Sequence, residues 1–261
     1  MRNPGKPTRE LFIGEIISMT FSLYSSRFLL LITPFLIGGA IMGIASTAVQ
    51  TAFPFPAVPS ATADLTTLWN WFVLLISTVI IVVILQGIIS LMVGAVTGGI
   101  AIKCISDQLE KGTVSLQESL RYALSRLPSL IGVQLLTGIL IGIGLLLLVI
   151  PGIIFTIMFS LVLQAMIIEQ TGVFESLGRS RRLVGNRWGK TFGVLLVISI
   201  ITLVVAWIAS VIAAPFGIAS TLVSGLISAV ASPIYTIALT LLYYSMRARE
   251  LPPPPPPPPP I

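Results

Sequence analysis

Five of the chain's 15 basic residues are concentrated in residues 173–190, VFESLGRSRRLVGNRWGK. Such a cluster could bind nucleic acid or the anionic headgroups of lipids. Its polar side chains recur at steps of three and four, with apolar ones opposite, and the stretch precedes a long apolar segment. Contact with anionic lipid is therefore the simpler interpretation, and we expect no nucleic-acid partner. A second basic stretch, residues 114–127, also precedes an apolar segment. Together the two stretches give the candidate lipid contacts, which are Arg121, Arg126, Arg179, Arg181, Arg182, Arg187 and Lys190.

Three glutamines, Gln86, Gln134 and Gln164, are the strongest polar groups inside the apolar segments. A polar side chain within a membrane either hydrogen bonds between helices or lines a substrate path. We expect interhelical hydrogen bonding, and a path stays the alternative. No Lys, Arg, Asp or Glu falls in a predicted span core, which weakens ion-coupled transport.

The residues for enzyme chemistry are scarce. The chain has no histidine and one cysteine, Cys104, and it carries no phosphate loop and no GxSxG motif. Histidine is the commonest general base and metal ligand. We therefore expect no catalytic residue, no metal, no cofactor and no enzymatic activity.

The elements that must position these residues are apolar helices. The chain is 55% hydrophobic and only 9% charged, whereas soluble domains carry about 25% charged residues. This composition predicts an all-α integral membrane protein with six spans at residues 28–50, 68–93, 130–150, 151–168, 191–214 and 218–246. The uncharged run 68–102 is about 50 Å long as a helix, so it must tilt, extend into the cytosol or break near Gly94–Gly99.

The distribution of charge predicts the topology. All 15 Lys and Arg fall in four clusters: the two termini and the connections between spans two and three and between spans four and five. With six spans these clusters share one side, and the positive-inside rule makes that side cytoplasmic. We therefore expect a multi-pass protein of the cell membrane with both termini in the cytoplasm. Trp69, Trp71 and Trp188 flank span ends, whereas Trp207 lies inside the fifth span and is expected to pack.

Three segments at 10–27, 114–127 and 173–188 show helical alternation of polar and apolar residues. Each precedes two spans, and each is predicted to be an amphipathic helix in the membrane interface. The chain therefore resembles three hairpin units, each with such a lead-in helix.

Two further features concern partners. Pairs of glycines at GxxxG spacing let helices approach closely, within the chain or between copies; they are Gly39 and Gly43, Gly94 and Gly98, Gly138 and Gly142. The tail, residues 250–261, contains nine consecutive prolines. It is expected to be a cytosolic polyproline II rod, a spacer or a ligand for the aromatic groove of a protein partner.

The stretches GEIISMTFSLYSSRFLLLITPFLI, VFESLGRSRRLVGNRWGK and LLYYSMR resemble the glycerophosphoryl diester phosphodiesterase membrane-domain family, over roughly residues 8–249. The resemblance implies a stand-alone membrane module, because the chain has no room for the family's catalytic barrel. The family more often carries Asp at the position of Ser245. The expected function is a non-enzymatic scaffold or accessory module that interacts with lipids. The alternative is a transporter or channel for a small uncharged or amphiphilic substrate.

Overall fold

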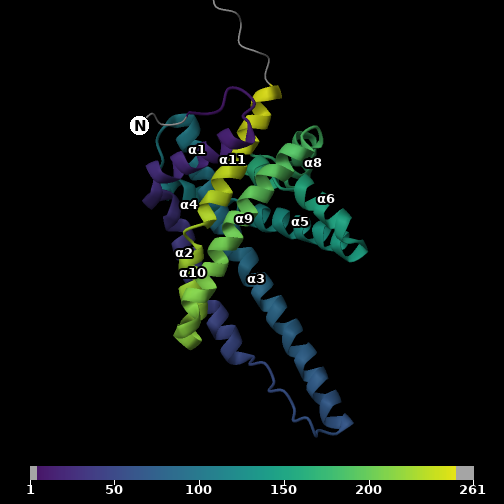
Figure 1. The fold of residues 1–261 in the computed structure, drawn as a ribbon. Helices are drawn as coiled ribbons and strands as arrows, with labels where there is room; N and C mark the ends of the chain where they lie inside the picture. Colours follow the sequence, from purple (N-terminus) through teal and green to yellow (C-terminus); the bar gives the residue numbers. More distant parts are fainter. Residues whose placement is uncertain (1–4, 251–261) are drawn as a thin grey trace, which may run out of the picture.

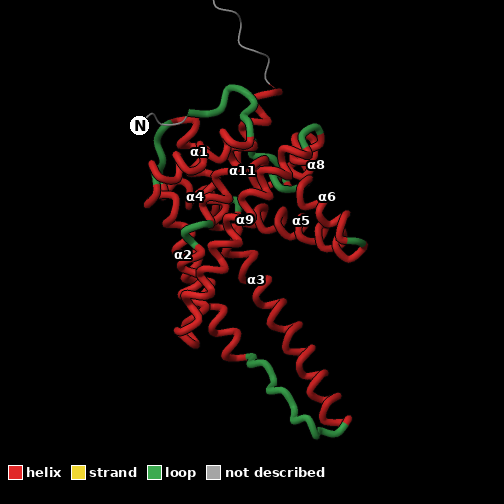
Figure 2. The backbone as a smooth tube through the Cα atoms, in the orientation of Figure 1, coloured by secondary structure: helices red, strands yellow, loops and turns green. Residues whose placement is uncertain are grey.

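The structure is a computed structural model that describes residues 5–250, and every regular element in that range is a helix (Figures 1 and 2). The polyproline run lies outside the described residues. The elements are α1 (Ile13–Ser26), α2 (Phe28–Ala52), α3 (Leu65–Lys111), α4 (Leu116–Ser125), α5 (Leu127–Leu147), α6 (Val149–Met158), α7 (Val162–Ile168), α8 (Val173–Gly185), α9 (Trp188–Ala213), the 3₁₀ helix η1 (Ala214–Ala219), α10 (Ser220–Ser228) and α11 (Ser232–Glu250).

Six helical stretches are long and apolar enough to cross a membrane, judged by length and composition, so the protein is membrane-embedded. The all-α prediction is confirmed. The stretches are Phe28–Ala52, Leu65–Lys111, Leu127–Leu147, Val149–Ile168, Trp188–Gly217 and Ser220–Glu250. Two of them are interrupted: the fourth between α6 and α7, and the sixth between α10 and α11, just before Pro233.

Helix α3 is continuous over 47 residues, which is about 70 Å at 1.5 Å per residue. It does not break at Gly94–Gly99. Its first half, residues 65–88, leaves the rest of the molecule (Figure 1), and only Thr78 is buried there. We call this segment the α3 arm. Its last part, from Gly99 to Leu109, is almost entirely buried, so the excess length extends into the packed end of the protein.

The turn between α5 and α6 comes earlier than the predicted boundary at Ile150 and Pro151. Leu148 alone is extended, with φ −167° and ψ 152°, and α6 begins at Val149. Pro151 therefore lies in the first turn of α6, where its missing N–H costs nothing. A Cβ on Gly144 would come within 3.0 Å of the Gly152 backbone, so the two glycines let the helices close tightly.

The GxxxG glycines differ in their surroundings, and a Cβ on Gly94 would meet only the amide oxygen of Gln134, at 3.5 Å. A Cβ on Gly39 would lie 2.8 Å from the Gly225 carbonyl oxygen, so the first pair lets α2 approach α10 within the chain. Gly98, Gly138 and Gly142 have nothing within 4 Å of such an atom, and an oligomer contact through them stays a prediction.

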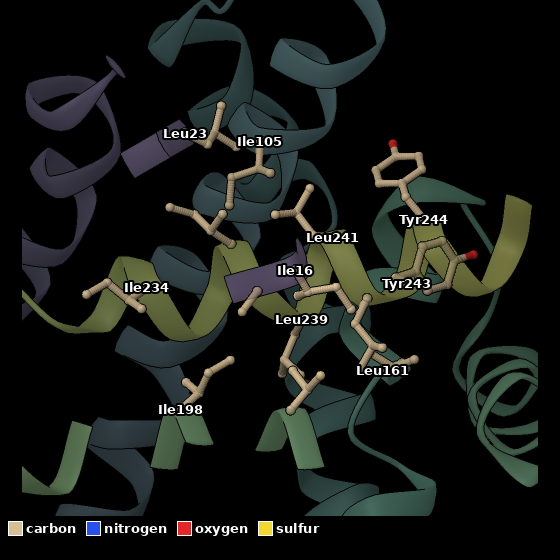
Figure 3. Close-up of a cluster of buried hydrophobic side chains, with 14 of the residues drawn as sticks. Ile16, Leu23, Ile105, Leu161, Ile198, Ile234, Leu239, Leu241, Tyr243 and Tyr244 are labelled. Atoms are coloured by element: carbon tan, nitrogen blue, oxygen red, sulfur yellow. The ribbon is translucent and has the colours of Figure 1, made fainter. Parts of the chain in front are cut away.

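The core is centred on α11, which packs against α1, α3 and α9. Figure 3 shows Ile16 and Leu23 of α1 directed toward this cluster. Helix α1 is amphipathic as expected, with Ser18, Ser22 and Ser25 exposed, but its apolar face is covered by protein. Its position in a membrane interface, like the three hairpin units, stays a prediction.

Trp207 corrects one expectation. Its side chain is 67% exposed, so it does not pack inside the chain. Helix α9 turns this side chain away from its neighbours, and an apolar environment outside the protein must cover it.

Candidate functional site

Helices α1, α4, α8, the end of α3 and the second half of α11 gather at one end of the molecule, at the top of Figure 1. The ion pairs of the described chain all involve residues at this end, which we call the charged end. Two clusters within it include candidate lipid contacts.

The first cluster is built on Arg179 of α8. Its Nε lies 2.9 Å from Oε2 of Glu169, and its second terminal nitrogen lies 2.6 Å from Oε2 of Glu250. Burial of Glu169 alone would raise its carboxyl pKa, but Arg179 and Arg247 hold it below the ordinary value. The two carboxylates raise the pKa of Arg179. This arginine is 15% exposed and is engaged inside the protein.

The second cluster joins the N-terminal segment to α9 and α11. Glu10 accepts from Arg187 Nη2 at 3.0 Å and from Lys190 Nζ at 3.1 Å, and forms an ion pair with each. Lys190 also donates to the hydroxyl of Ser245 at 3.2 Å, and the backbone N–H of Leu11 donates to the same oxygen at 2.8 Å. Partial burial acts to raise the pKa of Glu10, yet Lys190 and Arg187 together lower it.

The other candidate lipid contacts have no such partners. Arg121, Arg181 and Arg182 are exposed and Arg126 is half-buried, and no carboxylate of the described residues lies within 4 Å of them. The structure thus divides the seven predicted residues into three that are paired and four that are free to meet a ligand.

Small side chains let α8 approach the interrupted fourth span. Ser180 is fully buried; its hydroxyl donates to the Met158 carbonyl at 2.8 Å and accepts from the Leu161 N–H at 3.2 Å. These bonds satisfy backbone groups that the break between α6 and α7 leaves without helical partners. The interruption is therefore stabilised by specific hydrogen bonds from α8.

The three glutamines separate into two environments. Gln86 accepts from the Ser46 hydroxyl at 3.0 Å and so links α3 to α2, which is the interhelical role expected of it. Gln134 and Gln164 instead line one cavity of about 490 Å³. Its walls come from α3, α5, α6, α7 and α11, and from the residues between α6 and α7.

This cavity combines apolar walls with unsatisfied polar groups. The amide oxygen of Gln164, the amide nitrogen of Gln134 and the hydroxyl of Thr137 have no hydrogen-bond partner. All three residues line the cavity, and Gln164 is only 2% exposed. Buried polar atoms without partners are rare and costly, so each calls for an explanation.

Within residues 5–250, no group of three or more His, Cys, Asp or Glu could hold a metal ion. Cys104 is fully buried. The arrangement can bind anions at the charged end and neutral polar groups in the cavity.

The sequence analysis did not identify Glu10 or Thr137, and it named Ser245 only as a position where the resembled family carries Asp. The partners of Glu10 are at least 177 positions away in the sequence, so no local pattern predicts the pairing. Thr137 had a signal: Gln134, Thr137, Gly138 and Ile141 recur at helical spacing on one face of α5.

A family model described as "Domain of unknown function (DUF7847)" matches residues 12–249. No curated protein and no solved structure matches the chain. Nothing in these comparisons links it to the glycerophosphoryl diester phosphodiesterase membrane-domain family, so that resemblance stays a prediction.

Proposed function

Since the chain belongs to the DUF7847 family, a domain of unknown function, we propose its function from its own geometry. It is a non-enzymatic, multi-pass membrane module whose charged end lies on the cytoplasmic side of the cell membrane and contacts anionic lipid headgroups. Both termini lie on that side.

The observation that carries this proposal is the division of the basic residues. Arg179, Arg187 and Lys190 are neutralised by carboxylates, but Arg181 and Arg182 on the same stretch are exposed without an acidic partner. Arg181 and Arg182 are therefore the basic groups of this stretch that can meet an anionic headgroup without first breaking an ion pair.

Exposed apolar side chains accompany the free arginines. On α4, Leu120 and Leu124 are 40% and 50% exposed on either side of Arg121, and on α8 Phe174 is 79% exposed. Basic and apolar groups exposed together are typical of helices at a membrane interface, where headgroups meet the former and acyl chains the latter. Each basic residue near an anionic surface contributes about 1 kcal/mol.

The test is the double variant Arg181→Gln, Arg182→Gln of the full chain in nanodiscs. Titration with an anionic phospholipid, followed by native mass spectrometry, should show affinity reduced by about five- to thirtyfold, with unchanged affinity for a zwitterionic lipid. Arg179→Gln serves as the control, because the charge of Arg179 is already paired. This variant should be less stable, but its folded fraction should bind the anionic lipid as tightly as the unaltered protein. Unchanged anionic-lipid affinity of the double variant would contradict the proposal.

A second candidate function is transport of a small uncharged or amphiphilic molecule, and the cavity lined by Gln134 and Gln164 favours it. Proteoliposomes carrying a fluorescent neutral lipid would test it. Protein-dependent movement of the lipid between leaflets would support transport, and equal rates with and without protein would leave only binding.

We propose no phosphodiesterase activity for the chain, and no cofactor. The sequence has no histidine to serve as a general base or a metal ligand. The sequence analysis identified no other catalytic residue. Hydrolysis of a glycerophosphodiester by the purified protein would overturn this. The polyproline tail as a ligand for a protein partner also stays a proposal.

A further inference from the structure

We propose that the cavity between α3, α5, α7 and α11 is a binding site for a neutral, hydroxyl-bearing amphiphile of the bilayer, of the diacylglycerol class. The inference deepens the second candidate function, since it names the class of molecule, but binding without transport would satisfy it. It is independent of the arginines at the charged end.

The walls of the cavity exclude a charged headgroup. No Lys, Arg, Asp or Glu lines it, and most of its exposed surface is apolar. A charge placed there would lose its hydration without gaining a counter-ion, which is strongly unfavourable in an apolar site. A molecule that enters must therefore be uncharged and largely hydrocarbon.

The polar atoms define the other half of the ligand. Gln164 offers an unpartnered acceptor, and Gln134 an unpartnered donor. A hydroxyl of the ligand can donate to the Gln164 amide oxygen and accept from the Gln134 amide nitrogen. An ester carbonyl of the ligand can accept from Gln134 or from the Thr137 hydroxyl. These atoms lie just beneath the cavity wall, and rotation about the soft terminal torsion of an amide would bring them to an occupant.

Glycines make the room. Gly98 of α3 and Gly138 of α5 both line the cavity, and a Cβ on either would meet nothing within 4 Å. A glycine that no neighbour requires for close packing leaves space, and here the space is part of the site. The volume of about 490 Å³ falls in the range of small-molecule pockets.

The cavity has a route from the bilayer. The α3 arm and the α5–α6 hairpin diverge from the body of the molecule in different directions (Figures 1 and 2). Gly87 of the α3 arm, Ser90 and Leu91 just after it, and Thr137 and Ile141 of α5 all line the cavity. An amphiphile can therefore enter sideways, with its acyl chains left between the two diverging elements.

The experiment uses a diacylglycerol with a diazirine in one acyl chain, close to the ester, and the full-length protein in nanodiscs. After irradiation, labelled peptides are identified by mass spectrometry. The proposal predicts saturable labelling of α5 and α7. A phosphatidic acid with the same diazirine chain should label these peptides at least tenfold less, because its headgroup is charged.

Two pairs of variants separate the site from general lipid contact. Gly138→Leu fills the cavity and should reduce labelling at least tenfold, whereas Gly142→Leu, also in open space but outside the cavity, should leave it unchanged. Gln164→Met removes the acceptor and should reduce labelling about five- to tenfold. Gln86→Met, outside the cavity, should leave labelling unchanged and lower thermal stability, because it breaks the bond to Ser46.

A ligand site also predicts an unusual stability result. Gln164→Met should leave the melting temperature of the lipid-free protein unchanged or raise it, because it removes an unpartnered buried atom. A purely structural glutamine would give a loss of stability.

Equal labelling of Gly138→Leu and the unaltered chain, or equal labelling by phosphatidic acid, would overturn the proposal. Neither result depends on the anionic-lipid affinity measured with the arginine variants.

Discussion

The charged end and the α3 arm differ in what covers their apolar side chains. At the charged end and in the core next to it, α11 buries Ile237, Leu241 and both tyrosines 243 and 244 completely, and ion pairs link segments far apart in sequence. Along the α3 arm, residues such as Ile80 and Val83 are 52% and 64% exposed, and only Thr78 is buried. Both regions carry large apolar side chains.

The difference separates two sources of stability. The charged end is held by the protein's own contacts, like the core of a soluble domain. The α3 arm has few such contacts, the bond from Ser46 to Gln86 among them, so we expect lipid to cover most of its surface. Its helical backbone bonds keep it intact there. The cavity lies between these two regions, since its lining includes residues of α11 and Gly87 of the α3 arm.

The largest effect should come from the core. Ile237→Ala removes a fully buried side chain and should destabilise the protein by about 3 kcal/mol, whereas Ile80→Ala on the α3 arm should cost less than about 0.5 kcal/mol. Reversible unfolding in detergent would measure both. Comparable losses would mean that the arm packs against protein after all.

The ion pairs should come next. Glu169→Gln leaves Arg179 with one carboxylate fewer in a site where it is 15% exposed, and should cost about 2 kcal/mol. Arg181→Gln, one of the exposed arginines, should change stability by less than about 0.5 kcal/mol. The same unfolding assay applies, and a ranking in the opposite order would contradict the division of the basic residues.

Acid should weaken the charged end through the same carboxylates. The pKa values of Glu10 and Glu169 are lowered in the folded protein, so their contribution is complete above the unfolded value of 4.5. It is lost as the pH falls through the lower folded values. We expect the melting temperature to be flat from pH 7 to about 5 and to fall below about 4.5. Glu169→Gln should flatten that fall; an unchanged acid slope would assign the loss to other groups.

The smallest effect concerns Ser245, which is fully buried beside Lys190 and the Leu11 N–H. Ser245→Asp places a carboxylate next to two donors, one of them charged, and should change stability by less than about 1 kcal/mol. Ser245→Val leaves both donors without that acceptor and should cost about 1–2 kcal/mol. If thermal unfolding found the aspartate as harmful as the valine, Lys190 would not be the partner that the structure shows.

Hydropathy sufficed to predict the helical class and the number of long apolar helices, because each needs only a run of residues. Periodicity likewise identified the segments that form α1, α4 and α8. It could not say what covers an apolar face: that of α1 lies against α11, and the pattern would be the same beneath headgroups.

The site was less accessible from sequence. Gln134 and Gln164 share a cavity while Gln86 does not, and this depends on how α3, α5 and α7 are rotated about their axes. Likewise, Arg179 and Arg182 belong to one polar stripe in the sequence, yet they differ because only Arg179 pairs with Glu169 and Glu250. Such pairings are fixed by tertiary packing alone.

The central claim is that the charged end lies at the headgroups and the α3 arm in the hydrocarbon. Nitroxide labels at Phe174→Cys, Leu124→Cys and Ile80→Cys, in a Cys104→Ala background, would test it by comparing collision rates with oxygen and a water-soluble nickel chelate in nanodiscs. We predict a headgroup depth for positions 124 and 174 and a deep hydrocarbon position for 80. Equal depths at 80 and 174, or position 80 in water, would contradict the account.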